Sequence, residues 1–357
     1  MNPNRISSLR SSFESLNIDA FMVTFLPHLR YLTGFSGSNG IGIVTHRGTY
    51  LITDGRYEEQ VKREALGWTT EVAHDYNILD IIKKKRYFRA GMRIGFDGNT
   101  VTLAQYNNYK KTFPKVFFRP RAEVIENITV RKDDQELSLL KKAIEITDNV
   151  FTDILPLIKP GVMEADIAAE LTYRHRKYGA DSDAFEPIVA SGTQGALPHA
   201  RASAKKIKHG EMVTLDFGCV YQGYHSDLTR TVAVGKPSKE MHKIYHVVLE
   251  AQQKAIETAK SGMTGKELDA VAREHIKQHG YGKYFQHSLG HGIGLQIHEA
   301  PKVSFTNSKP MPERSVVTIE PGIYIPNLGG VRIEDDVVLY NSGAEVLNRS
   351  PKELIVL

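Results

Sequence analysis

The chain has 357 residues, of which 41% are hydrophobic and 24% charged, and its formal net charge is +5. This composition excludes a disordered or fibrous chain, and the length exceeds what one hydrophobic core usually supports, so we expect two domains. The basic runs at 83–86 and 205–208 lack the interleaved aromatic residues of nucleic-acid-binding motifs. We interpret them as solvated surface and predict no nucleic-acid partner.

Cysteine usage and hydropathy bear on the cellular compartment. The single cysteine, Cys219, cannot form an intramolecular disulfide, which is typical of a reducing compartment. Residues 1–10 lack the apolar segment of a signal peptide, and no stretch stays apolar for the roughly 18 residues of a membrane span. We therefore predict a cytoplasmic protein with no membrane partner.

Residues 1–128 alternate short apolar strands with polar helices, which predicts an α/β domain. From Lys132 the pattern changes to a long helix, with Asp133 or Asp134 as its N-cap. Residues 129–357 then combine helices with strands, which predicts an α+β domain whose antiparallel sheet is covered by helices on one side. The elements expected are helices at 6–16, 55–66, 164–178, 239–260 and 266–278, and strands at 20–25, 40–45, 49–53, 212–217, 229–234, 316–319 and 331–339.

Five candidate metal ligands occur in glycine-punctuated segments of the second domain. Asp216 in TLDFG and Glu320 in TIEPG directly follow apolar runs, where a carboxylate lies near the core and needs a partner. Asp227 in HSDLTRT, His291 in HSLGHGIG and Glu334 in VRIEDD complete the set. Two divalent cations would neutralise the four carboxylates, so the set indicates a dinuclear site.

The spacing of these residues is compatible with such a site. Asp216 and Asp227 are eleven residues apart across a glycine-containing segment, which suits the two strands of a hairpin. Gly290 and Gly292 flank His291 and leave room for a metal or substrate to approach the backbone.

The segments LPHARAS, LDFG, SDLTRT, HSLGHGIGLQIHE, IEPGIY and GGVRIED, in this order, resemble the metallopeptidase family with the pita-bread fold. That family includes methionine aminopeptidase, aminopeptidase P and prolidase. In the first domain, YLTGFSGSNG and TDGRYEE resemble the Xaa-Pro branch of the family. The resemblance implies a creatinase/prolidase-like domain over 1–128 and a pita-bread catalytic domain over 129–357.

The resemblance also implies roles for the five ligands. Asp216 would bind one metal, His291 and Glu320 would bind the other, and Asp227 and Glu334 would bridge the two. Glu320 would in addition carry a proton toward the leaving amine.

Further residues match positions of the family that surround the metals. His199 and His287 would position the substrate or assist protonation, and His298 would stabilise the developing oxyanion. Tyr324 and Arg332 would hydrogen-bond ligand carboxylates and keep them oriented and ionised.

The ligand set suits Mn²⁺, Co²⁺, Fe²⁺ or Zn²⁺, and cellular availability favours Mn²⁺. We expect cleavage of the Xaa-Pro bond at the N-terminus of dipeptides or short peptides, by a homodimer. Lys302 could recognise the free carboxylate of a dipeptide, or it could be a solvated loop residue. The alternatives are an aminopeptidase P for longer peptides, a methionine-type aminopeptidase, and a non-catalytic binding protein on the same fold.

Overall fold

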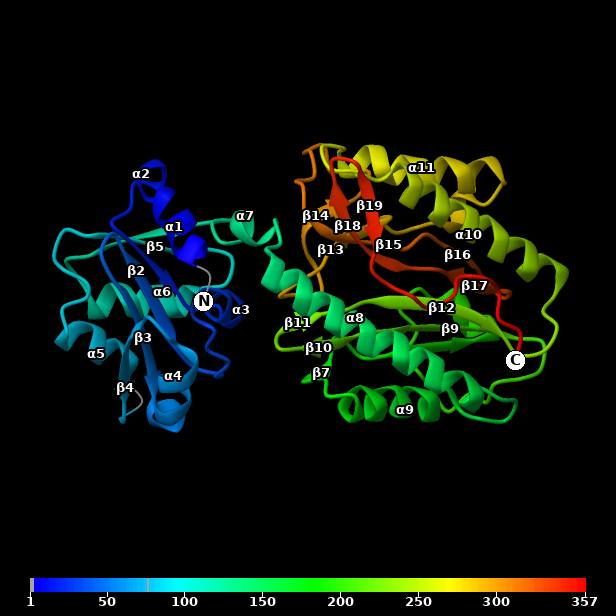
Figure 1. Ribbon diagram of the computed structural model, residues 1–357, viewed down its shortest axis with the longest axis horizontal. Coiled ribbons are helices and arrows are strands. Elements are labelled where there is room, and N and C mark those ends of the chain that lie inside the picture. Colours follow the sequence, from blue (N-terminus) through cyan, green and yellow to red (C-terminus); the bar gives the residue numbers. More distant parts are fainter. Residues whose placement is uncertain (1–2, 76) are drawn as a thin grey trace. The chain divides into compact units, whose positions relative to one another are not determined.

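The computed structural model describes residues 3–75 and 77–357. The chain divides into two compact units, Met1–Thr129 and Val130–Leu357, which are coloured blue to cyan and green to red in Figure 1. Each unit builds its own hydrophobic core, so each is described by itself. No helix in the described part of the chain is both long and apolar enough to cross a membrane.

The first unit is a mixed six-stranded sheet with strand order β4-β3-β2-β1-β5-β6. The pairs β1–β5, β3–β4 and β5–β6 are parallel, whereas β1–β2 and β2–β3 are antiparallel. The strands are β1 (Ala20–Val23), β2 (Ile41–Thr45), β3 (Thr49–Asp54), β4 (Thr69–Ala73), β5 (Arg93–Asp97) and β6 (Phe117–Arg121). The helices are α1 (Pro3–Ser11), α2 (Phe13–Leu16), α3 (Leu26–Thr33), α4 (Glu58–Glu64), α5 (Ile78–Lys84), α6 (Leu103–Thr112) and α7 (Glu126–Thr129). The predicted α/β architecture is confirmed, although the single helix expected at 6–16 is two helices that meet at Ser12.

The second unit contains two helix pairs, each associated with its own antiparallel strands. The helices are α8 (Asp134–Ile154), α9 (Glu164–Lys177), α10 (Lys239–Thr258) and α11 (Gly265–Gln278). Asp133, one of the two N-cap residues expected, caps α8 and forms a capping box with Glu136. Figure 1 shows α8 and α9 beside the green strands, and α10 and α11 beside the orange and red strands.

The strands of the second unit form several small sheets. One three-stranded sheet has the order β12-β9-β8 and another the order β11-β10-β7, while a five-stranded sheet has the order β14-β13-β15-β18-β19 and β16 pairs with β17. The strands are β7 (Ser182–Asp183), β8 (Ile188–Ser191), β9 (Met212–Phe217), β10 (Cys219–Tyr221), β11 (Tyr224–His225), β12 (Leu228–Ala233), β13 (Gly290–Gly292), β14 (Glu299–Val303), β15 (Val316–Ile319), β16 (Gly322–Ile325), β17 (Gly329–Arg332), β18 (Asp335–Tyr340) and β19 (Gly343–Val346). The α+β prediction for this unit is confirmed.

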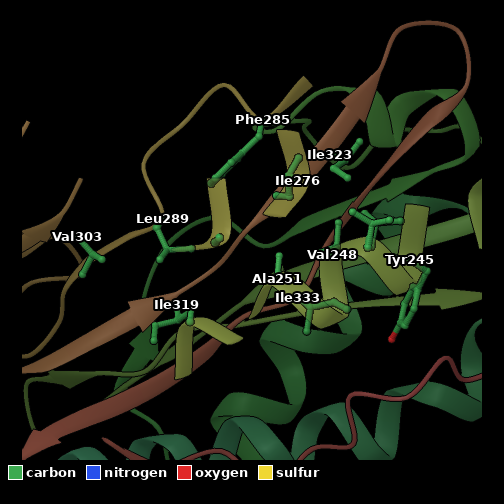
Figure 2. Close-up of a cluster of buried hydrophobic side chains, with 14 of the residues drawn as sticks. Tyr245, Val248, Ala251, Ile276, Phe285, Leu289, Val303, Ile319, Ile323 and Ile333 are labelled. Carbon is green, nitrogen blue, oxygen red and sulfur yellow. The ribbon is translucent and has the colours of Figure 1, made fainter. Parts of the chain in front are cut away.

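Apolar packing fixes each helix pair to its strands. In the core around α10 and α11, Tyr245 and Val248 of α10 lie near Ile276 of α11 and near Ile323 and Ile333 of the strand region (Figure 2). Burying one such side chain contributes about 1.5–3 kcal/mol. The strand ends in this unit are therefore held by a rigid apolar layer.

The region predicted as one strand at 331–339 is two strands in two different sheets, so that prediction is wrong in this detail. β17 ends at Arg332 and pairs with β16, whereas β18 begins at Asp335 and pairs with β15. Between them the backbone N–H of Glu334 donates to the carbonyl of Thr229 in β12, at 3.1 Å. Glu334 therefore lies at the crossing between sheets.

Candidate metal centre

The five predicted ligands come from the ends and crossings of strands in the second unit. Asp216 lies in β9, Asp227 precedes β12, and β9 and β12 form the predicted antiparallel hairpin in which Asp216 pairs with Thr229. His291 is the central residue of β13, Glu320 follows β15, and Glu334 lies between β17 and β18. Two β-sheets and one crossing segment therefore carry the ligands, which are far apart in the sequence.

The side chains of Asp227, Glu320 and Glu334 meet around the imidazole of His291. Its Nε2 lies 3.4 Å from Glu320 Oε1 and 3.6 Å from Asp227 Oδ2. One ligand atom each from Asp227, His291 and Glu334 all lie within 4.8 Å of one another. These separations suit atoms that share a cation at the usual 2.0–2.2 Å.

Two carboxylate oxygens in this cluster are buried without a hydrogen-bond partner. Asp227 is 4% exposed and Glu334 is 1% exposed. Asp227 Oδ1 and Glu334 Oε1 have no partner among the residues that the structure describes. A buried polar atom without a partner costs free energy, and a bound cation would remove that cost.

Burial and mutual repulsion raise the pKa values of these carboxyl groups. Burial raises the pKa of Glu320 to about 8, with the charge of Asp216 adding to it. The pKa values of Asp227 and Glu334 are raised well above the ordinary range by burial and then by the neighbouring carboxylates. Without a cation, the cluster therefore holds protons near neutral pH.

His291 has the state that a metal ligand needs. Burial lowers its pKa to about 4, with a further effect of His298, so the ring is neutral near pH 7. Its Nδ1 donates to the carbonyl of Gly292 at 3.1 Å, which leaves the lone pair of Nε2 facing the carboxylates. The neutral imidazole and the unpartnered oxygens together fit divalent cations.

Arg332 joins several residues around the cluster. Its Nη2 donates to Asp216 Oδ2, and its Nε donates to the hydroxyl of Thr229 at 3.1 Å. That hydroxyl in turn donates to Glu334 Oε2 at 2.7 Å. Nη1 donates to the hydroxyl of Tyr324 at 2.7 Å, and burial raises the pKa of Tyr324 to about 12. Arg332 therefore hydrogen-bonds the carboxylate of Asp216 as expected, whereas the hydroxyl of Tyr324 bonds to His287 and Arg332 and to no ligand carboxylate among the described residues.

The three predicted histidines lie in different environments. The Nδ1 of His287 donates to the carbonyl of Ser288 at 2.8 Å, and its Nε2 accepts from the hydroxyl of Tyr324 at 2.9 Å. Burial lowers the pKa of His287 to about 4, so it is neutral and both ring nitrogens are engaged. His298 is exposed, and its ring centroid lies 4.3 Å from that of His291. His199 is also exposed. The pKa of His298 is lowered first by its own partial burial and then by the charge of His199.

Residues of α11 hold the segment that carries His287, and the sequence did not indicate them. Arg273 donates to the carbonyls of Phe285 at 3.1 Å and His287 at 2.8 Å. Asp269 accepts from the N–H of Leu289 at 3.0 Å and pairs with Arg273 through both oxygens. In the sequence these two residues are only an acid and a base four positions apart, as on many helix surfaces.

Thr229 and Lys302 illustrate what the motifs could and could not indicate. Thr229 was also missed, although it lies within SDLTRT, two positions after Asp227. Lys302 lies exposed in β14, and its carbonyl accepts from the side chain of Asn307 at 2.7 Å. This contact gives Lys302 no role in the cluster.

The fold and the carboxylate–histidine cluster define a class, the two-domain metallopeptidases with a pita-bread catalytic domain. The model of metallopeptidase family M24 matches residues 138–341, and that of the creatinase/prolidase N-terminal domain matches residues 5–128. The chain belongs to metallopeptidase family M24 and is a peptidase that depends on divalent metal ions.

Similar proteins match over nearly the whole chain. An Xaa-Pro dipeptidase from Pyrococcus furiosus is 38% identical, with 98% of this chain and 99% of the relative covered. The solved structure of an Xaa-Pro dipeptidase from Bacillus anthracis is 43% identical, covers 99% of both chains and has a TM-score of 0.95. An X-Pro aminopeptidase from Thermotoga maritima is 39% identical, with 97% and 100% covered and a TM-score of 0.92.

Proposed function

We propose that this chain is a dinuclear Xaa-Pro dipeptidase, which hydrolyses the bond between an N-terminal residue and proline. The observation that carries the proposal is the cluster of Asp227, His291 and Glu334, in which buried carboxylate oxygens lack partners and the imidazole is neutral. The Xaa-Pro dipeptidases among its relatives supply the substrate class.

In this proposal Asp216 would hold one cation, His291 and Glu320 would hold the second, and Asp227 and Glu334 would be shared by the two. Mn²⁺ is the proposed ion, with Co²⁺, Zn²⁺ and Fe²⁺ as alternatives of similar ligand preference. When bound, such cations polarise a carbonyl and lower the pKa of water. Arg332 orients Asp216 and keeps it ionised, because the buried guanidinium donates directly to its carboxylate.

The other residues act on the substrate and on protons. Glu320 has a pKa raised to about 8 in the metal-free protein, which marks it as a group able to hold a proton near neutral pH. His298, exposed beside His291, donates to the oxyanion that forms from the scissile carbonyl. His199 contacts the substrate, while His287 positions Tyr324 and, through it, Arg332.

Substrate length is tested with Ala-Pro, Ala-Pro-amide and Ala-Pro-Ala. A dipeptidase should have the highest kcat/KM for Ala-Pro, because the other two lack a carboxylate directly on proline. Equal or faster cleavage of Ala-Pro-Ala would favour an aminopeptidase P, an activity suggested by the X-Pro aminopeptidase relative.

The role of Lys302 is tested by the same three substrates. If its charge recognises the dipeptide carboxylate, Lys302→Ala should reduce the preference for Ala-Pro, whereas Lys309→Ala, another exposed lysine nearby, should not. An unchanged preference in Lys302→Ala would remove this residue from substrate recognition.

We also propose a cytoplasmic homodimer. The buried free thiol of Cys219 is compatible with a reducing compartment. Light scattering at micromolar concentration should give about twice the chain mass of 40.0 kDa, and a value equal to the chain mass would contradict the dimer.

A further inference from the structure

We propose a second, separate metal site on the paired helices α10 and α11, formed by Glu250, His275 and His279, which takes a borderline divalent cation such as Zn²⁺. One ligand atom from each of these residues lies within 4.8 Å of the other two. Glu250 comes from α10, whereas His275 lies in the last turn of α11 and His279 is the C-cap residue of that helix. None of the three belongs to the proposed peptidase site.

The separations in this cluster match those of the peptidase site. His275 Nε2 lies 3.3 Å from Glu250 Oε2, compared with 3.4 Å between His291 Nε2 and Glu320 Oε1. Two ligand atoms at about 2.0–2.1 Å from a tetrahedral zinc ion lie roughly 3.4 Å apart. The positions of the donors therefore suit one shared cation without rearrangement of the helices.

The ring nitrogens give a second, independent observation. His279 Nδ1 donates to the carbonyl of His275 at 2.9 Å, so its Nε2 carries the lone pair, as in His291. His275 is 5% exposed, and its Nε2 is buried without hydrogen-bond geometry to any residue that the structure describes. Once the ring carries its proton on Nδ1, this buried nitrogen and the carboxylate of Glu250, 3.3 Å away, can share a cation.

Lys254 opposes this site and limits its affinity. Its Nζ lies 2.9 Å from His275 Nδ1 and can only donate, so the neutral ring carries its proton on Nε2. For Nε2 to bind a metal, the single proton of the neutral ring must exchange from Nε2 to Nδ1, with no net proton release, and Lys254 must then move away from Nδ1. Lys254 is exposed and can turn into solvent, so the contact competes with the metal without excluding it.

The chain offers a matched control. His242 and His246 are also one turn apart on α10 and exposed, with their Nε2 atoms 3.4 Å apart. No carboxylate joins them in a three-ligand cluster within the described part of the chain. The zinc bound by this pair therefore serves as the control for binding to two exposed histidines without a carboxylate.

The experiment counts total metal per chain in Mn²⁺-loaded enzyme after equilibrium dialysis against Zn²⁺. The wild type and His246→Ala should hold one more equivalent than His279→Ala and Glu250→Gln. Lys254→Met should bind the extra zinc at least about tenfold more tightly, since the competing contact is gone. Because the readout is a difference between variants, it does not depend on how many ions the peptidase site holds or on its substrate.

A second readout separates a built site from adventitious binding. Zn²⁺ should raise the unfolding temperature of Mn²⁺-loaded wild type and His246→Ala, but not that of His279→Ala, since only a site of the folded state stabilises it. Equal metal content in the wild type and His279→Ala would overturn the proposal. So would loss of the extra equivalent in His246→Ala.

Discussion

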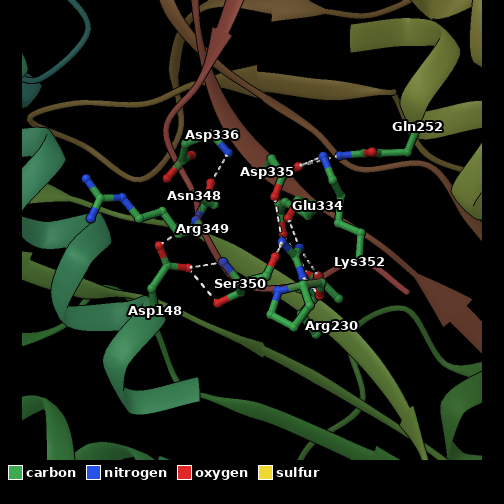
Figure 3. Close-up of polar contacts among 12 residues, drawn as sticks. Asp148, Arg230, Gln252, Glu334, Asp335, Asp336, Asn348, Arg349, Ser350 and Lys352 are labelled. Atoms are coloured by element: carbon green, nitrogen blue, oxygen red, sulfur yellow. Dashed lines mark hydrogen bonds and ion pairs between the residues drawn. The ribbon is translucent and has the colours of Figure 1, made fainter. Parts of the chain in front are cut away.

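Two neighbouring acids at the start of β18, Glu334 and Asp335, are both buried but have opposite surroundings. Asp335 accepts from Arg230 at 2.7 Å through one oxygen, and from Gln252 at 2.8 Å and Lys352 at 2.7 Å through the other (Figure 3). Glu334 has one oxygen bonded to Thr229 and the other without a partner. Consecutive residues of extended chain point to opposite faces, so one acid faces a protein cation and the other faces the metal cluster.

The difference distinguishes a buried carboxylate that stabilises the fold from buried carboxylates that are available to bind cations. On the Asp335 side the protein itself supplies the positive charges, and the network ties β18 to β12, α10 and the C-terminal segment (Figure 3). On the Glu334 side, Asp227 and Glu334 lack such partners, and burial together with repulsion raises their pKa values. The negative charge there is left for cations that the solvent supplies.

The largest expected effect is loss of metal when a proposed bridging ligand is removed. Asp227→Ala and Glu334→Ala should each lose both ions, because two nearby cations would have less negative charge between them. Activity should fall by more than the roughly 100-fold typical of changes outside the coordination sphere. Elemental analysis checks this prediction, and two ions retained in either variant would contradict the assignment.

The structural side of the comparison predicts a loss of stability instead. Asp335→Ala leaves Arg230, which is 1% exposed, buried without its carboxylate, and should lower the free energy of unfolding by about 3–5 kcal/mol. Denaturant unfolding of the metal-loaded protein measures this. Lys352→Ala serves as the control, because that lysine is partly exposed and its removal should cost far less. Equal stability of Asp335→Ala and the wild type would remove the distinction between the two acids.

The sequence placed Glu334 in the proposed ligand set, but it did not show the different surroundings of Glu334 and Asp335. Glu334 and Asp335 stand together in GGVRIED, and nothing in that motif shows which one faces a cation of the protein. The answer depends on the break between β17 and β18, which the interpretation of 331–339 as a single strand missed. Arg230 and Lys352, which meet Asp335, are distant in sequence, so only the folded chain brings them together.

His298 separates metal binding from catalysis within the proposed site. His298→Ala should retain the metal content of the wild type, because this exposed ring makes an edge-to-face contact with His291 and is not one of the clustered ligands. If it stabilises the oxyanion, kcat should fall by about 10²–10³-fold. Elemental analysis and steady-state kinetics on the same preparation check both parts, and wild-type turnover of the fully loaded variant would remove His298 from the mechanism.

Stability of the metal-free protein should depend on pH in a direction set by the raised pKa values. Glu320 titrates at about 8 in the folded state and near 4.5 in the unfolded chain, so the folded state holds the extra proton between these values. The free energy of unfolding should therefore fall as pH rises from about 4.5 to about 8, by up to ~1.4 kcal/mol per pH unit for each such group. Urea unfolding at several pH values checks this, and metal-loaded protein should lose the dependence. A stability that rises with pH in the metal-free form over this range would contradict it.

Proton release on metal binding tests the central claim most directly. Metal-free protein is titrated with Mn²⁺ at pH 7 in buffers of different ionisation enthalpy, and calorimetry gives the number of protons released per chain. The pKa of Glu320 is about 8, and the pKa values of Asp227 and Glu334 are also raised. Metal binding should therefore release at least one proton per chain. Binding of Mn²⁺ with no proton release would show that the cluster is already ionised without metal, and would contradict the account of an uncompensated acidic site.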